Sequence, residues 1–400
     1  MVSELIAMNS RERLLTTLDH REPDRVPFDL GSVQVTGIHV VAYRNLRQAL
    51  GLPPVNVQLC DYIQQLALPD DDLIERLEVD VRGLFPLNSH NWNVHEEDAG
   101  EYWRYHDEWG ITHHRPKPDG LYYSIVQVPL GSPEISVQDI ERHPWPNMAD
   151  PQRIAGLREQ AERYRAAGYG VVLKDPFAGI FEMAQRIVGM ENCLIMMASD
   201  KKLAGALFDK LLELKLAFWE MALPQLADPS AGSGQAVVDV ISQADDYGTQ
   251  TSQLISPRMF REQIKPRLKV LFERIKQLAP NAKRFFHSCG NVRPLLPDFI
   301  EIGVEILNPV HIRARGMEPA ALKREFGDEL VFWGGGVDTQ GVLPSGTPQA
   351  VKDDVRRNIE ALAPGGGFVF NTVHNIQADV PPQNIIAMWE ALQEYGVYCN

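Results

Sequence analysis

Residues 284–307, RFFHSCGNVRPLLPDFIEIGVEIL, contain one strand–helix–strand unit. The short apolar run at 284–287 predicts a buried strand, and Pro294 opens a segment with helical spacing that continues to residue 302. A second apolar run follows at residues 304–307. Strands that alternate with helices in this way are typical of a parallel sheet, so the unit predicts an α/β fold.

The same alternation continues on both sides of this unit, from about residue 150 onward. Further strands are expected at residues 170–174, 236–242, 330–333 and 367–371. Helices are expected at residues 151–167, with Asp150 as the cap, and at 200–227, 257–278, 319–326, 348–362 and 382–395. With two more strands in the N-terminal third, the pattern predicts a TIM-type (β/α)8 barrel. A doubly wound open sheet is the alternative.

The N-terminal third is less regular. Ser10 is expected to cap a helix over residues 11–20, and a strand-like run follows at residues 25–30. Residues of about 30–150 show only short strand signals, at 102–105 and 110–112. We therefore expect one domain over residues 1–400, in which an N-terminal extension and a lid-like insertion lie at the barrel mouth.

Composition limits the possible partners of the protein. The formal net charge of −14 opposes attraction to nucleic acid or anionic membranes. No apolar run reaches the roughly 18 residues that span a bilayer, and the first residues lack the pattern of a secretion signal, so we expect a cytoplasmic protein. The four cysteines show no disulfide spacing; Cys60 and Cys193 are expected to fill apolar space, and Cys399 lies at the terminus.

Polar residues follow many of the predicted strands. In a parallel barrel, the carboxyl ends of the strands share one mouth, where the reactive groups gather. The residues at these positions are Lys174, Asp175, Asp245, Asp246, Tyr247, His287, Ser288, Cys289, Asn308, Asp338 and the stretch 371–375.

The pair His287 and Cys289 is the sharpest local signal for chemistry. Residues i and i+2 of an extended segment point the same way, so one imidazole and one thiolate can reach one zinc ion. His374, which also follows a predicted strand, is the expected third ligand; its alternative role is to donate a hydrogen bond to the substrate. A His-x-Cys pair also arises by chance, and a structural role without metal is the competing interpretation.

Acidic and polar neighbours are expected to complete the site. Asp245 and Asp246 are adjacent carboxylates, and we expect them to act with His374 in catalysis; the alternative is a solvated loop or a cap for the following helix. The residues expected to contact substrate are Glu182, Tyr247, Asn371 and Asn375. Glu182 also fits an ordinary carboxylate at a helix N-terminus. Trp92, Trp103 and Trp109 either line a lid for a large flat ligand or belong to the core.

Taken in order, several segments resemble the uroporphyrinogen decarboxylase superfamily over nearly the whole chain. They are RER (11–13), DRVP (24–27), DEWG (107–110), HPWP (143–146), DDYG (245–248), SP (256–257), FR (260–261), FHSCG (286–290), WGGGVD (333–338), and GGF (366–368) through His374 to PP (381–382) and Asn384. The resemblance implies a (β/α)8 barrel with its active cleft at the C-terminal mouth.

Two branches of this superfamily differ in their functional residues. Its decarboxylases carry an arginine-rich segment, Met-Arg-Gln-Ala-Gly-Arg, that holds the substrate carboxylates; the equivalent stretch here, residues 28–33, reads FDLGSV and contains no arginine. In the cobalamin-dependent methyltransferases, a His-x-Cys pair and a later cysteine hold zinc. His287 and Cys289 match that pair, whereas His374 stands in the later position and matches the histidine that decarboxylases place there.

The resemblance therefore implies a zinc-assisted, corrinoid-dependent methyltransferase. Such an enzyme moves a methyl group between a methylated small molecule or corrinoid protein and a thiol or cobalt acceptor, with cobalamin free or on a partner protein, and a homodimer is expected. Two alternatives stay open: a metal-free, decarboxylase-like lyase that uses His374 and Asp246 as acid–base groups, and a non-catalytic binder of a corrinoid or tetrapyrrole.

Overall fold

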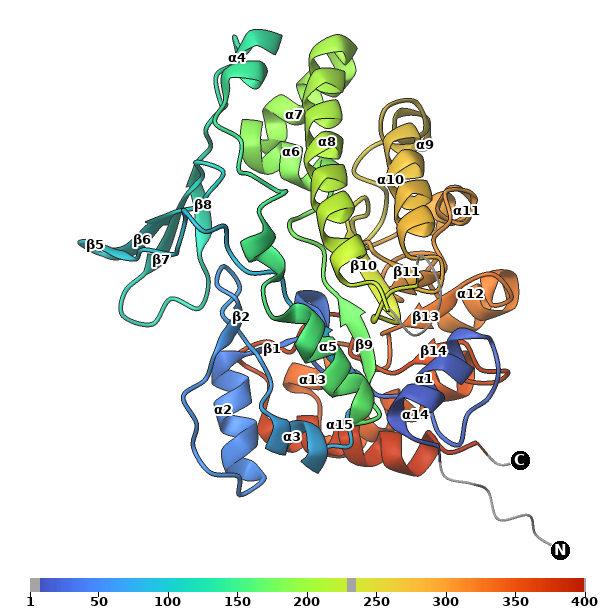
Figure 1. Ribbon diagram of the computed structural model, residues 1–400. Coiled ribbons are helices and arrows are strands. Elements are labelled where there is room, and N and C mark those ends of the chain that lie inside the picture. The colour runs from blue at the N-terminus through green and yellow to red at the C-terminus, as the bar shows by residue number, and fades with distance from the viewer. Residues whose placement is uncertain (1–7, 229–234, 399–400) are drawn as a thin grey trace, which may run out of the picture.

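A parallel sheet forms the centre of the molecule. The computed structural model describes residues 8–228 and 235–398. Within them, neighbouring strands of one sheet run parallel in the order β14-β13-β12-β11-β10-β9-β4 (Figure 1). Their bounds are β4 Val81–Leu84, β9 Gly170–Leu173, β10 Val240–Ala244, β11 Lys283–His287, β12 Ile306–Asn308, β13 Val331–Trp333 and β14 Phe368–Val369.

Residues 27–29 join the two edges of this sheet. The backbone amide of Asp29 donates to the carbonyl of Phe370, just after β14, and the amide of Phe370 donates to the carbonyl of Pro27. On the other side, the amide of Asp80, just before β4, donates to the carbonyl of Phe28. The sheet therefore closes on itself, and the predicted TIM-type barrel is confirmed, whereas the open-sheet alternative is wrong.

An inward-facing row of large apolar side chains fills the barrel. Each of its seven strands contributes to one buried cluster, which consists of Val81, Val172, Val240, Phe285, Ile306, Val331, Trp333 and Val369 with Leu14, Leu18, Val33 and Val35. Leu14 and Leu18 belong to helix α1 (Ser10–Leu18), which closes the N-terminal end of the barrel. Asn9 caps α1, since its side chain accepts from the amide of Glu12, so the prediction that Ser10 is the cap is wrong.

Helices surround the strands on the outside. They are α5 Leu157–Ala166, α6 Ile180–Val188, α7 Met190–Ser199, α8 Lys201–Gln225, α9 Pro257–Met259, α10 Lys265–Leu278, α11 Leu296–Glu301, α12 Pro319–Phe326, α13 Val342–Ser345, α14 Pro348–Leu362 and α15 Pro382–Tyr395. Two predicted helices are divided. The π-helical segment η3 Phe260–Ile264 separates α9 from α10, and a 3-10 turn, η2 Pro151–Ile154, precedes α5; Asp150 caps η2 as expected.

The segment for which the sequence indicated irregular structure contains one barrel strand, β4, and two small antiparallel sheets. One has the order β1-β3-β2, from Ile38–His39, Leu66–Ala67 and Leu59–Asp61. The other, which we call the lid sheet, has the order β5-β6-β7-β8, from Glu97–Ala99, Tyr102–His106, Thr112–Pro116 and Ser124–Gln127. Figure 1 shows the lid sheet standing to one side of the barrel. Short helices α2 Val40–Ala49, α3 Asp71–Arg76 and α4 Val137–Arg142 accompany these sheets.

Several sequence expectations differ from the structure in detail. The strand expected at 236–242 begins at Val240, and Gly110 with Ile111 forms the turn before β7 rather than a strand. Cys193 is buried as expected and Cys60 is partly buried, while Cys399 lies outside the described residues. Among residues 8–228 and 235–398, none of the helices is long and apolar enough to cross a membrane.

The packing of α1 against the N-terminal end of the barrel gives the first prediction. Leu14 has no exposed surface and packs beside Gly170 at the start of β9. Leu14→Ala leaves a cavity in the barrel end, so we expect the free energy of unfolding in urea to fall by about 2–5 kcal/mol. The control, Leu121→Ala, changes a side chain that is 40% exposed and should shift it by less than about 0.5 kcal/mol. If both substitutions lowered the free energy of unfolding equally, the packing of α1 into the barrel end would not be a specific source of stability.

Candidate metal centre and substrate cavity

Three potential metal ligands meet at the mouth of the barrel. His287 is the last residue of β11, Cys289 follows it, and His374 lies in the loop after β14. One ligand atom from each of the three side chains lies within 4.8 Å of the other two. The His287 and His374 rings have centroids 5.5 Å apart, and Nε2 of His287 lies 3.5 Å from Sγ of Cys289. The structure thus brings together the three residues that the sequence predicted as ligands.

Asn308 orients the His287 ring. The pairing of β11 with β12 places Asn308 directly beside His287, and the Oδ1 of Asn308 is hydrogen-bonded to Nδ1 of His287. Nδ2 of Asn308 donates to the carbonyl of Trp333 at 2.7 Å, so the amide oxygen faces the imidazole. Nδ1 of His287 must therefore carry the proton, which leaves the lone pair of Nε2 directed toward the cluster.

A second asparagine orients His374 in the same manner. Nδ1 of His374 lies 2.9 Å from Oδ1 of Asn375, while Nδ2 of Asn375 donates to Oε1 of Gln64 at 2.8 Å. Burial, followed by the charge of His287, lowers the pKa of His374 to about 4. The ring is consequently neutral at pH 7, the form in which imidazole binds a metal.

Cys289 is held by its backbone. Its amide donates to Oδ1 of Asp246 at 2.8 Å. The next residue, Gly290, has a φ of +81°, and a Cβ there would lie 2.5 Å from the backbone of Gly248, so only glycine fits. Burial, and after it the charges of Asp246 and Glu182, raise the pKa of the Cys289 thiol well above its ordinary value.

The donor set fits zinc. Two imidazoles and one thiol that can become a thiolate are ligands that zinc prefers, and a site with three protein ligands is typical of catalytic zinc. The partly buried thiol stands among negative charges, an arrangement that a bound cation would relieve because metal coordination deprotonates a thiol. His287 and His374 line a cavity, so a metal ion that these residues held would lie beside that cavity.

The adjacent carboxylates have different surroundings. Asp246 lines the cavity, with Oδ1 3.6 Å from Nε2 of His287. Asp245 is fully buried and accepts from the amides of Phe181 and Glu182, so it caps α6. Burial raises the pKa of Asp245 to about 7. Of the predicted catalytic pair, the structure therefore brings only Asp246 to the cluster. Asp245 caps α6, which precedes it in the chain, and not the following helix of the alternative.

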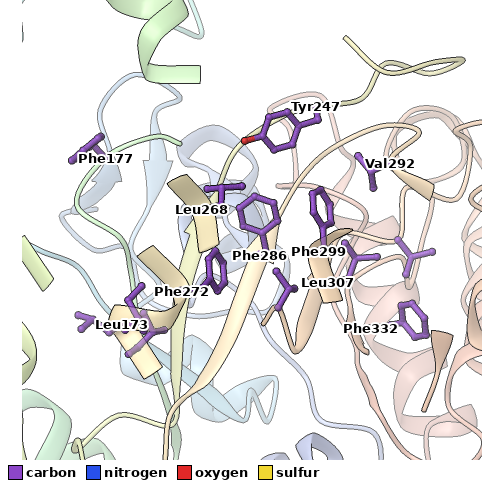
Figure 2. Close-up of a cluster of buried hydrophobic side chains, with 14 of the residues drawn as sticks. Leu173, Phe177, Tyr247, Leu268, Phe272, Phe286, Val292, Phe299, Leu307 and Phe332 are labelled. Atoms are coloured by element: carbon purple, nitrogen blue, oxygen red, sulfur yellow. The ribbon is translucent and has the colours of Figure 1, made fainter. Parts of the chain in front are cut away.

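Two of the four predicted substrate contacts lie inside the fold. Tyr247 has no exposed surface, donates its hydroxyl to Asp245, and packs among buried phenylalanines, including Phe286 and Phe299 (Figure 2). Asn371 donates from Nδ2 to the backbone carbonyls of Asp29 and Thr36. These placements do not favour substrate contact.

Glu182 and Asn375 lie closer to the reactive groups. Glu182 lines the cavity and accepts from Arg186 at 2.5 Å. Asn375 is buried and serves to hold His374. For these two residues the sequence predicted the correct end of the barrel, although a substrate contact of either stays a prediction.

The cavity beside the cluster has a volume of about 410 Å³ and is built from the barrel mouth and the insertion. The barrel contributes Ala244, Asp246, His287 and His374, and the β9–α6 region contributes Lys174, Pro176, Phe177, Ala178, Glu182, Met183 and Arg186. The N-terminal third contributes Gln34, Val35, Cys60, Asp61, Tyr62, Ile63, Gln64, Asn88, Trp92, Val94, Tyr105, Asp107, Glu108, Trp109 and Ile111. Residues of the N-terminal third therefore form much of the cavity wall.

The predicted tryptophans divide between this wall and the surface. Trp92 and Trp109 line the cavity. Trp103 does not; Nζ of Lys117 lies over its ring, 4.0 Å from the ring centroid. Sequence reasoning missed Asp61, Tyr62 and Gln64, since nothing in the sequence indicates that this loop returns to the mouth. Asn308 was predicted to lie at a strand end, but no role was predicted for it. Its place at the end of the strand that follows His287 was the signal that could have indicated contact with that histidine.

The asparagine beside His287 gives the second prediction. Asn308→Ala removes the acceptor that fixes the His287 ring, so we expect zinc affinity, measured by competition with a chromophoric chelator, to fall about 10–100-fold. Asn371→Ala is the matched control, because Asn371 is also a buried asparagine at this end of the barrel but touches neither histidine. If both variants lose zinc equally, Asn308 has no specific role in orienting His287.

The fold resembles that of a solved methyltransferase over nearly the whole chain. That methyltransferase comes from Methanosarcina mazei, with a TM-score of 0.62 and 20% sequence identity over 97% of this chain and 99% of that one. Because the identity is low, this likeness supports the fold alone. An endo-glycoceramidase II from a Rhodococcus species (14% identity, 56% of this chain and 60% of that one, TM-score 0.35) and a GH10 xylanase from termite gut (9%, 72% and 68%, TM-score 0.35) are too distant to support any argument.

Sequence comparison identifies the family. No curated protein matches the chain. The profile of the family described as "Uroporphyrinogen decarboxylase (URO-D)" matches residues 126–395, which is more than half of the sequence. This match includes β9 to β14 and all three residues of the candidate metal centre. The chain therefore belongs to the uroporphyrinogen decarboxylase (URO-D) family.

Proposed function

We propose that the protein is a corrinoid-dependent methyltransferase that holds zinc with His287, Cys289 and His374 and methylates a small thiol. The observation that carries this proposal is the meeting of the three ligand atoms within 4.8 Å beside the cavity. The likeness of the fold to that of a methyltransferase agrees with it. The methylated corrinoid is proposed to arrive free or on a partner protein, and the enzyme is proposed to act in the cytoplasm as a homodimer.

The protein residues have separate tasks in this reaction. Zinc, when bound, would supply positive charge that keeps a substrate thiol deprotonated at neutral pH. His287, Cys289 and His374 hold it, and Asn308 and Asn375 keep both rings turned toward it.

Asp246 is the proposed acceptor of the thiol proton. Its Oδ1 receives the Cys289 amide, while Oδ2 has no hydrogen bond within residues 8–228 and 235–398 and is available to take the proton. Methyl transfer then forms a bond between the substrate sulfur and the methyl carbon. The carbon–cobalt bond breaks, and its electron pair stays on cobalt.

The geometry gives less support to a metal-free lyase. A general acid or base works best when its pKa lies near the working pH, whereas that of His374 is lowered to about 4. The cavity also has few cations for a carboxylate substrate: the Arg186 guanidinium is engaged by Glu182, which leaves Lys174.

Metal content and methyl transfer test the proposal together. We expect about one zinc per chain in the wild type, and loss of zinc with at least about 100-fold slower methylation of 2-mercaptoethanol by methylcobalamin in His287→Ala and Cys289→Ala. Cys60→Ala is the control, because it removes another partly buried thiol at the cavity without touching the cluster. A folded wild type that binds no supplied zinc, as judged by elemental analysis, would reject the proposal.

The pH dependence of zinc binding gives a further prediction. The raised pKa means that the Cys289 thiol is protonated in the metal-free protein, so zinc must displace one proton, and a higher pH favours binding. We expect the affinity to rise about tenfold per unit between about pH 7 and 8.5, up to the raised pKa of the thiol. His374 adds no slope there because its pKa is about 4. Cys289→Ala should flatten the dependence; an unchanged slope in that variant would contradict thiolate ligation.

A further inference from the structure

Aromatic rings form part of the cavity wall that lies beside the metal centre. Tyr62, Tyr105 and Trp109 line the cavity and are braced by other rings. The Tyr62 and Tyr105 rings meet edge to face with centroids 5.2 Å apart, and the Trp109 ring lies 4.7 Å from that of Phe177. Tyr105 and Trp109 are 3% and 6% exposed, so these rings are fixed surfaces rather than loose covers. Aromatic rings attract cations through their faces. One face of the Tyr62 ring is stacked on Tyr123 and one face of the Tyr105 ring on His113, so each of these two rings has only its other face for a cation.

Acidic side chains exceed basic ones around the same space. The lining carboxylates are Asp61, Asp107, Glu108, Glu182 and Asp246, against the cations Lys174 and Arg186. Two of the five are neutralised: Glu108 by Arg153 from behind the wall and Glu182 by Arg186. The remaining carboxylates outnumber Lys174.

Asp61 and Asp107 lie beside the rings of Tyr62, Tyr105 and Trp109, which we call the ring wall: Asp61 precedes Tyr62, and Asp107 lies between Tyr105 and Trp109 in the sequence. Asp61 accepts from the amide of Gln64 at 2.8 Å, and within residues 8–228 and 235–398 it forms no ion pair. Asp107 accepts from the amides of Trp109 and Ile111 and lies 2.9 Å from Nε2 of His113. Backbone hydrogen bonds therefore hold both carboxylates in place. Both also interact electrostatically with the Arg186 guanidinium, so Asp61, Asp107 and Glu182 together share one cation.

We propose that the substrate carries a cationic nitrogen, held by Asp61, Asp107 and the ring wall while its thiol faces the His–Cys–His cluster. This inference rests on the proposed function, because it names the class of thiol, an aminothiol, that the same site methylates. Carboxylates and ring faces both favour a cation, and both oppose a carboxylate or sulfonate at the same position. A cavity of about 410 Å³ has room for such a small molecule.

The first test compares two thiols of the same shape. Thiocholine has a permanently charged nitrogen that cannot bind metal, and 3,3-dimethylbutane-1-thiol is its neutral carbon analogue. In calorimetric titrations of the zinc-loaded protein, we expect thiocholine to bind at least about tenfold more tightly. Equal or tighter binding of the neutral thiol, or preference for the anionic 3-mercaptopropionate, would overturn the inference.

The second test removes the negative charge of Asp61 by substitution. Asp61→Asn keeps an oxygen for the Gln64 amide and should reduce the preference for thiocholine at least about threefold. Asp328→Asn is the matched control, because Asp328 is exposed in the loop before β13, at the opposite end of the barrel, and should leave the preference unchanged. An unchanged preference in Asp61→Asn would reject the role of Asp61.

Metal-free protein separates this inference from the proposed function. Choline and 3,3-dimethylbutan-1-ol have no thiol, so their relative binding tests the cation site without zinc or methyl transfer. Preference for choline in a protein that neither binds zinc nor transfers methyl groups would uphold the cation site and reject the proposed function. Zinc binding and methyl transfer without any preference for choline or thiocholine would do the reverse.

Discussion

The candidate site depends on the register of two adjacent strands. The pairing of β11 with β12 puts Asn308 beside His287, and the amide of Asn308 is itself fixed by the carbonyl of Trp333 on the next strand. Backbone pairing therefore determines which nitrogen of His287 faces Cys289. A shift of either strand by one residue would turn these side chains to the other face of the sheet and remove the site.

Burial makes the same site electrostatically unfavourable without a cation. The Cys289 thiol lies close to Asp246 and Glu182, and its pKa is raised for that reason as well as by burial. The Asp246 carboxylate nevertheless stays fixed, because the Cys289 amide donates to it. A protein that gained only stability here would place apolar side chains around the thiol. The retained charges are those that the proposed zinc ion would neutralise.

The sequence predicted those features that depend on local pattern. Alternating apolar runs and proline-initiated helices indicated the barrel, and the i and i+2 spacing placed His287 and Cys289 on one side of an extended segment. Contacts between distant segments could not be predicted from local pattern. The sequence predicted a strand-like run at residues 25–30 but not its partners, since residues 27–29 close the barrel through backbone hydrogen bonds to Phe370 and Asp80. Asp245 likewise caps a helix that begins far earlier in the chain. Adjacent acidic residues look alike in sequence, although one is buried and the other lines the cavity.

The insertion and the barrel are not independent parts of the site. Most of the cavity wall comes from the N-terminal third, so its rings and carboxylates can select the substrate without altering the strands. One chain of hydrogen bonds crosses this division, from Gln64 through Asn375 to His374. Because Gln64 follows Asp61 closely, the loop that lines the cavity also supports the third proposed ligand. The cavity and the proposed metal centre therefore share the Asn375 amide, whose Oδ1 also accepts from Nε2 of Gln377.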